Sequence, residues 1–347
     1  MSLRPVICLT LLLSACTFQR WQPSQPSVLD DHMAHMSTAD TSPSALSAAS
    51  KNVQGTPGLP ASAINAEARL KASPRHAEWV KIAWEPGAKD SLMAWVVYPS
   101  ARTKAPVVVV VHEIFGLSTW VRGVADQVAA EGFIAIAPDF LSRVRGGPTS
   151  DELRSDSATR IIRGVNAEER NRAITAAANY AMMLPSAQQK YAVIGYCWGG
   201  QTTFMHAING GVKGFSGGVA FYGFPYTSGG APATATTAAT PTTINVDSLS
   251  KIKVPMMLLS GSNDARIGAA MPQLDSLMRV MGKSYVGKNY EGATHGFLRA
   301  QADPKATRDT AEEAANVAAT KDGWPLTISF LKKNLGANRR NRVVIAP

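Results

Sequence analysis

The chain has 347 residues, of which 45% are hydrophobic and 17% charged, so it can bury a large core and is not disordered as a whole. Its 35 lysine and arginine residues outnumber 25 aspartate and glutamate residues, which gives a formal net charge of +10. The basic residues are scattered, apart from a short cluster at residues 339–342, and this argues against nucleic-acid binding. We expect one domain of catalytic size.

The first 16 residues have the pattern of an export signal. One arginine precedes an apolar run at residues 6–13, which is too short to span a bilayer, and small residues lead to Cys16. Residues 13–16 resemble the bacterial lipobox, in which the cysteine is lipidated and becomes the first residue of the mature protein. A plain secretory signal is the alternative. We expect an exported protein of the bacterial cell envelope, facing the periplasm and anchored to the membrane by a lipid on Cys16.

Residues 17–75 are rich in Ser, Ala, Thr and Pro and lack apolar periodicity, which predicts a flexible tether. Two histidines and two methionines, at His32, Met33, His35 and Met36, lie close together in this tether and have the donor types that bind copper. A linker without any metal is the alternative. A rival function follows from this cluster: a non-catalytic envelope lipoprotein that holds metal on its linker.

From residue 76 to residue 335, short apolar runs alternate with longer helical segments. Strands are expected at residues 92–98, 107–111, 133–137, 191–194, 218–221, 255–260 and 284–290, and helices at 120–131, 168–184, from 199, 273–281 and 310–335. Residues 142–157 are expected to form a loop over the strand ends, 227–243 an exposed insertion, and 336–347 a basic tail. This alternation predicts an α/β fold with a mostly parallel sheet, helices on both faces and functional groups at the carboxyl ends of the strands.

A cysteine occupies a strand-to-helix turn at residues 195–199, Gly-Tyr-Cys-Trp-Gly. This is the GxSxG pattern of a nucleophile elbow with cysteine in the serine position, and the turn directs the amide of Trp198 towards a developing oxyanion. The other two cysteines belong to the predicted signal, so Cys197 has no internal disulfide partner and is either an inert buried residue or a reactive thiol. A structural cysteine in a glycine-rich turn is the alternative to a nucleophile.

An acid and a base follow the cysteine in chain order, each directly after a predicted strand. Asp264 follows the strand at 255–260, and His295 follows the strand at 284–290. We expect His295 to take the thiol proton and return one to the leaving oxygen, and Asp264 to fix its tautomer and orientation. The alternatives are a simple turn at Asp264 and an exposed polar histidine.

The segment His-Glu-Ile-Phe-Gly, residues 112–116, follows the predicted strand at 107–111. A loop in this place supplies the second amide of an oxyanion hole, here that of Ile114. Glu113 puts a carboxylate beside the thiol, and a nearby anion raises the pKa of a thiol and holds it neutral. We therefore expect Glu113 to keep Cys197 unreactive until the carboxylate is displaced. An exposed acid that caps the next helix is the alternative.

Together, these motifs resemble the dienelactone hydrolase family of the α/β-hydrolase superfamily, over roughly residues 76–335. The resemblance implies a small-molecule lactone or ester substrate, an acyl-cysteine intermediate on Cys197 with Asp264 and His295, and no metal or organic cofactor. It further implies that Glu113 contacts the resting thiol, then moves and assists its deprotonation when an anionic substrate binds.

The resemblance also implies that arginines hold the carboxylate of the substrate. One of them follows the catalytic histidine by four residues and corresponds to Arg299, for which a solvated charge is the alternative. The second falls after the strand at 133–137, where four candidates compete: Arg143, Arg145, Arg154 and Arg160. The sequence does not choose among these four, and it does not indicate an oligomeric state.

Overall fold

The computed structural model describes residues 59–336, except positions 86, 102, 151–152, 226, 229–242, 302 and 304–305. The predicted signal with Cys16, the His32/His35 cluster and the basic tail therefore lie outside the described residues, as does most of the 227–243 insertion. Within the described part of the chain, no helix has the length and apolar character needed to cross a membrane.

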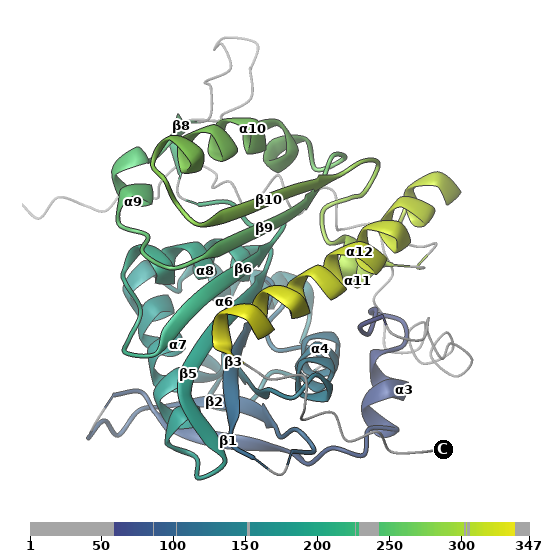
Figure 1. Ribbon diagram of the computed structural model, residues 1–347. Helices are drawn as coiled ribbons and strands as arrows, with labels where there is room; N and C mark the ends of the chain where they lie inside the picture. The colour runs from purple at the N-terminus through teal and green to yellow at the C-terminus, as the bar shows by residue number, and fades with distance from the viewer. Residues whose placement is uncertain are drawn as a thin grey trace, which may run out of the picture. The chain divides into compact units, whose positions relative to one another are not determined.

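The described chain is built around a sheet of eight strands in the order β1-β2-β4-β3-β5-β6-β9-β10 (Figure 1). β1 is antiparallel to β2 and β2 to β4, and all other neighbours are parallel. The strands are β1 (Ala77–Ala83), β2 (Ser91–Val97), β3 (Ala105–Val111), β4 (Ile134–Pro138), β5 (Ala187–Tyr196), β6 (Phe215–Phe221), β9 (Met256–Gly261) and β10 (Tyr285–Tyr290). The expected mostly parallel α/β fold is confirmed.

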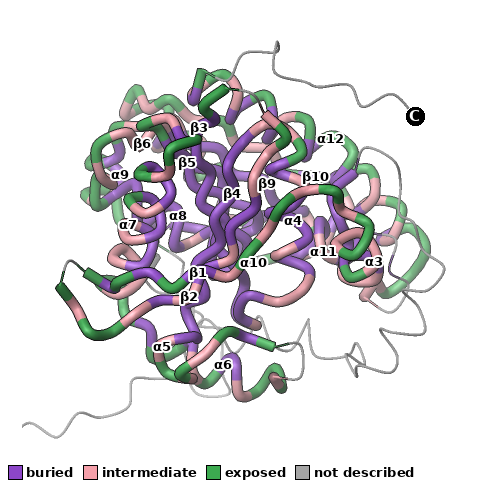
Figure 2. Tube along the Cα trace, turned by 90° about the horizontal axis from the view of Figure 1, so that it is seen from below, coloured by how far each residue is buried: buried purple, intermediate pink, exposed green. Residues whose placement is uncertain are grey.

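The central strands are apolar along their length because helices cover both of their faces. β3 has the sequence Ala-Pro followed by five valines and is buried throughout, as are β4 and β9 (Figure 2). β1, at one edge of the sheet, alternates buried and more exposed residues in its second half. This difference follows the rule that strands covered on both faces read as continuous apolar runs.

Helices cover the sheet on two sides. α12 (Thr310–Leu335) crosses one face, with α4 (Thr119–Ala130) on the same side, and α7 (Ala167–Met183) and α8 (Trp198–Ile208) lie behind the sheet in Figure 1. α10 (Ala265–Val280) packs on β9 and β10. The short elements are α3 (Ala66–Lys71), α5 (Ser142–Arg145), α6 (Ser155–Arg163), α9 (Val246–Ser250), α11 (Phe297–Ala300), and a two-stranded ladder of β7 (Thr227–Ser228) and β8 (Thr243–Ile244).

Several segments differ from the sequence-based expectation, among them the edge strand β1, which has no counterpart among the expected strands. Residues 142–157, expected as a loop, contain α5 and the start of α6. α10 begins at Ala265 instead of residue 273, because the helix accommodates Pro272 and starts directly at its cap Asp264. Residues 59–75 were expected in the tether. They instead pack against α4, form the helix α3 and contain several buried residues.

Candidate active site

The candidate site lies at the carboxyl ends of five neighbouring strands. Glu113 follows β3, Cys197 follows β5, Tyr222 follows β6, Asp264 follows β9 and His295 follows β10. These strands are consecutive in the sheet and run parallel, so their carboxyl ends lie along one edge. The topology therefore gathers residues that are far apart in the sequence.

Cys197 occupies a strained turn between β5 and α8. Its φ of 54° and ψ of −115° lie in a region that residues other than glycine rarely adopt. Such a conformation costs on the order of 1–3 kcal/mol and persists only where the surroundings impose it. The turn makes Cys197 the cap of α8 and Trp198 its first residue, and the first amides of an α-helix have no partner within the helix.

Glycines make this turn sterically accessible. A Cβ atom on Gly195 would lie 1.9 Å from the carbonyl oxygen of Gly199, and one on Gly199 would lie 2.4 Å from that of Val111. Gly223, after β6, is equally close to Cys197, since its Cβ would lie 2.4 Å from the Cys197 carbonyl oxygen. Larger residues at these positions would push apart β3, β5 and the start of α8.

The loop after β3 lies beside the elbow, because Gly199 also approaches the carbonyl oxygen of His112. The Nδ1–H of His112 donates to the carbonyl oxygen of Glu113 at 2.6 Å, and its Nε2 accepts from the amide of Phe140 at 3.1 Å. The Phe140 amide is a donor, so Nε2 has to be the unprotonated nitrogen. Burial lowers the pKa of His112, against smaller opposing effects of Asp139 and the hydrogen bond to the backbone. A neutral His112 therefore fixes the loop that carries Glu113 and Ile114.

Asp264 and His295 form a close, buried pair. His295 Nδ1 lies 2.5 Å from Asp264 Oδ2, and the two side chains are 8% and 6% exposed. Burial lowers the pKa of His295, but its interactions with Cys197 and Asp264 outweigh burial and raise the pKa to about 10. The arrangement therefore favours a positively charged imidazole beside the Asp264 carboxylate.

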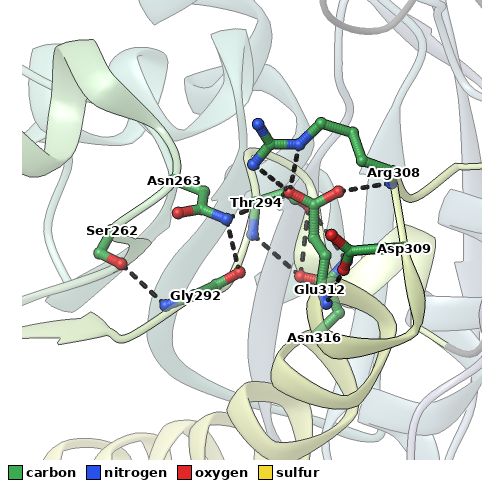
Figure 3. Close-up of polar contacts among 8 residues, drawn as sticks. All are labelled: Ser262, Asn263, Gly292, Thr294, Arg308, Asp309, Glu312 and Asn316. Atoms are coloured by element: carbon green, nitrogen blue, oxygen red, sulfur yellow. Dashed lines mark hydrogen bonds and ion pairs between the residues drawn. The ribbon is translucent and has the colours of Figure 1, made fainter.

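A polar network holds the loops of Asp264 and His295 against the start of α12 (Figure 3). Glu312 receives hydrogen bonds from Asn263 and Arg308, and its backbone amide is capped by Asp309. Asn316 is fully buried, and its Oδ1 accepts from the Thr294 amide at 2.9 Å. Thr294 immediately precedes His295, so this network sets the position of the imidazole.

Glu113 is almost completely buried. Its Oε2 lies 3.5 Å from Nε of Arg299, and neither carboxylate oxygen has a hydrogen-bond partner among the described residues. Burial raises the pKa of Glu113, while the charges of Arg299 and His295 act in the opposite direction. Arg299 also lies over the ring of Phe115 at 5.4 Å. The structure therefore places Arg299 beside Glu113 rather than as a solvated charge.

Two tyrosines at the site were not singled out by the sequence. Tyr222 has a φ of 39°, its ring lies 5.1 Å from that of His295 at a tilt of 58°, and it is within electrostatic reach of Glu113 and Cys197. Tyr196 is fully buried and packs on Tyr222. Burial raises the pKa of both phenols, with a further contribution from Glu113. The one available signal was position, since each tyrosine stands at or directly after the carboxyl end of a strand.

The four candidate second arginines have different surroundings. Arg143 is held by Asp90 at 2.5 Å and Glu169 at 3.0 Å, and its guanidinium lies 4.0 Å from the centre of the Trp84 ring. The other three are Arg145, which donates to the Pro148 carbonyl oxygen, Arg154, which pairs with Asp156, and Arg160, which is exposed. Arg143 and Arg160 line a cavity of about 340 Å³ together with Trp84, Phe140 and Ile161.

No described group of three or more His, Cys, Asp or Glu side chains is arranged to hold a metal ion. The described residues bring together a thiol, an imidazole, two carboxylates, an arginine, two phenols and backbone amides at the candidate site. Such a set suits acyl transfer through a nucleophile, a base with its orienting acid, and amides that receive an oxyanion.

Comparison with known proteins identifies the family of the chain. Residues 92–335 match the Dienelactone hydrolase family. The chain is 28% identical over 221 residues to a putative carboxymethylenebutenolidase of Synechocystis sp., which covers 61% of this chain and 84% of the relative. It is 28% identical over 214 residues to a carboxymethylenebutenolidase of Pseudomonas sp. strain P51, with 60% and 82% covered.

The fold is also similar to that of a putative dienelactone hydrolase from Klebsiella pneumoniae, with a TM-score of 0.57 and 22% identity over 75% of this chain and 99% of the other. That structure and the sheet order together establish an α/β-hydrolase-type fold. The family match covers every strand of the large sheet except β1 and the first residue of β2, and it includes Glu113, Cys197, Asp264 and His295. The chain is a hydrolase of lactone or ester bonds and belongs to the dienelactone hydrolase family.

Proposed function

We propose that this protein opens a carboxylate-bearing lactone or ester through an acyl-cysteine intermediate on Cys197. The observation that carries the proposal is the buried contact of 2.5 Å between His295 Nδ1 and Asp264 Oδ2, beside a cysteine in a strained elbow. A buried acid–base pair of this kind orients an imidazole for proton transfer, and a strained elbow presents a nucleophile.

In the first half of the reaction, the Cys197 sulfur attacks the carbonyl carbon and a sulfur–carbon bond forms. The carbonyl oxygen becomes an oxyanion, which the amides of Ile114 and Trp198 stabilise by about 2.7–4 kcal/mol per donor. The carbon–oxygen bond of the lactone or ester then breaks, and the protonated His295 gives its proton to the leaving oxygen. In the second half, His295 takes a proton from water, the oxygen of that water attacks the thioester carbonyl, and the carbon–sulfur bond breaks. The carboxylic acid leaves, and the Cys197 sulfur recovers the proton that it gave to Glu113 at the start.

Arg299 supplies the selectivity for acidic substrates in this proposal. Without substrate, its guanidinium faces the Glu113 carboxylate at 3.5 Å. A substrate carboxylate would compete with Glu113 for Arg299, and a charge-assisted hydrogen bond of this kind contributes about 1.5–3 kcal/mol. Glu113 would then be released to accept the thiol proton, which couples thiolate formation to the arrival of an anionic substrate.

We also propose that the protein works outside the cytoplasm. The support is the apolar run at residues 6–13, the small residues that lead to Cys16, and the tether that follows. Labelling with a palmitate analogue tests the lipid anchor, since Cys16→Ala should abolish incorporation. Incorporation into the Cys16→Ala protein would contradict the anchor.

The test of the catalytic proposal uses the mature chain, residues 17–347, with a carboxylate-bearing dienelactone and a neutral aryl ester of similar size. We expect faster turnover of the lactone, loss of both activities in Cys197→Ala, and loss of the preference alone in Arg299→Gln. Turnover of the neutral ester alone would refute the acidic substrate, and full activity of Cys197→Ala would refute the acyl-cysteine.

A further inference from the structure

We infer that residues 59–75, here called the N-terminal arm, position α11 and thereby hold Arg299 for recognition of a substrate carboxylate. This inference rests on the proposed function for the role of Arg299. The arm precedes the region of the family match, which begins at residue 92. It is therefore a feature that the family match itself does not supply.

The arm contacts α11 through the backbone of Arg299 itself. The amide of Ala63 donates to the carbonyl oxygen of Arg299 at 2.9 Å. The buried side-chain amide of Gln301 donates to the carbonyl oxygens of Pro60 at 3.0 Å and Leu298 at 2.9 Å, so it joins the arm to α11. These bonds connect the arm with the two residues that flank Ala300 at the end of α11.

A helix as short as α11 depends on such contacts. It spans only Phe297–Ala300, and a single turn gains too little from its own hydrogen bonds to be stable alone. The buried side chains of Phe297 and Leu298 hold its inner side. Of its carbonyl groups, that of Arg299 accepts from the arm, and that of Leu298 accepts from the Gln301 side chain. The direction of the Arg299 side chain, towards Glu113 and Phe115, is therefore set partly from outside the helix.

The arm is itself firmly anchored on α4. The indole Nε1 of Trp120 donates to the Ala61 carbonyl oxygen at 2.8 Å, and Gly123 leaves room for Ala61, whose Cβ would lie 3.2 Å from a Cβ at that position. At the other end of the arm, Asp126 accepts from Ser73 at 2.6 Å and from Arg75 Nε at 2.9 Å. The arm therefore links α4 to α11, and through α11 it holds Arg299 at the site.

The sharpest perturbation is Ala63→Pro in the mature chain. Ala63 is the second residue of a turn in which the Ser62 carbonyl oxygen accepts from the amides of Asn65 and Ala66, and proline is favoured at this position. Proline has no N–H, so the substitution removes the bond to Arg299. Gln301→Met is the second variant, because it removes both amide hydrogen bonds at nearly constant volume. Arg75→Gln is the matched control, since it loosens the arm at Asp126, away from α11.

Two measurements separate positioning from general stability. Hydrogen exchange is followed at residues 296–301, where the amides of Arg299 and Ala300 both donate to Gly296. Kinetics are measured with the carboxylate-bearing lactone and the neutral ester. For Ala63→Pro and Gln301→Met we expect faster exchange than in Arg75→Gln, and a roughly tenfold higher KM for the lactone, as for partial loss of a charge-assisted bond. The kcat for both substrates and the KM for the neutral ester should stay within about twofold of the values for the unsubstituted protein, which corresponds to a free-energy change of less than about 1 kcal/mol.

The outcomes distinguish this inference from the proposed function. Unchanged exchange at residues 296–301 in both variants would overturn the inference, whatever the kinetics. Faster exchange with equal losses on lactone and neutral ester would overturn the link to Arg299. If the unsubstituted protein turns over neither substrate, the proposed function fails, while the exchange experiment still decides whether the arm holds α11.

Discussion

The contact between Asn316 and Thr294 gives the sharpest prediction about the base. Asn316→Leu is close in size but removes the oxygen that accepts from the Thr294 amide at 2.9 Å and from its hydroxyl at 3.2 Å, as well as the Nδ2 donor at 3.1 Å. A partly buried amide left without a partner costs about 1–3 kcal/mol, and we expect the free energy of unfolding to fall by that amount.

The same substitution should lower catalysis more than stability alone explains. Thr294 immediately precedes His295, and a shift of a reacting group by about 1 Å lowers rates by up to about a hundredfold. We therefore expect kcat for ester hydrolysis to fall by roughly 10- to 100-fold at a temperature where the variant is fully folded. Steady-state kinetics and urea unfolding on the same preparation measure the two effects.

The matched control is Thr320→Val, one helical turn further along α12. Thr320 is fully buried, and its hydroxyl donates to the Asn316 carbonyl oxygen at 2.8 Å without reaching the His295 loop. It should lower stability and leave kcat within about twofold. If Asn316→Leu also keeps its kcat, the network in Figure 3 supports the fold and does not position the base.

Three further predictions concern other parts of the chain. Cys197→Ser should lose most activity, because a hydroxyl is intrinsically a weaker nucleophile than a thiol, and activity equal to that of the unsubstituted protein would contradict the role of the sulfur as nucleophile. Glu113→Gln should speed alkylation of Cys197 by iodoacetamide in the absence of substrate, and an unchanged rate would contradict the gating role of Glu113. Burial lowers the pKa of His206 from 6.5 to about 3, so the unfolded chain binds a proton below about pH 6.5 that the folded chain does not. The contribution of His206 to the free energy of unfolding is therefore fully present above that pH and falls by up to about 1.4 kcal/mol per pH unit as the pH drops towards 3. In urea unfolding, the His206→Gln variant should lose less of its free energy of unfolding between pH 7 and pH 5 than the unsubstituted protein.

The strands that carry the site follow from local patterns in the sequence, whereas the order of the strands in the sheet and the edge strand β1 do not. The five consecutive valines of β3 indicate by themselves a strand that is buried on both faces. Asp264 and His295 each follow an apolar run that indicates another strand. The sequence therefore predicts on which edge these residues meet, because parallel strands share the direction of their carboxyl ends.

Features that depend on distant partners were not predictable in this way. The composition of residues 59–75 resembles that of a linker, and its packing depends on Trp120, Asp126 and Gln301, which are remote in the chain. Arg143 could not be separated from its neighbours, because Asp90 and Glu169 hold it from two other segments. The role of Asn316 likewise cannot be recognised from the helical sequence around it, since its side chain bonds to a loop 22 residues earlier.

The bond between Gln301 and Pro60 joins residues that are 241 positions apart, and this separation bears on the order of folding. Contacts that close such long loops form late, because the entropy of closure is lost before the contact is gained. The arm leaves the ribosome before the rest of the described chain, yet its partner on α11 is synthesised only after β10. In pulse-labelling experiments, protection of the Ala63 amide should therefore appear after that of β3 and β5. Selectivity would then be the last property that the maturing enzyme acquires.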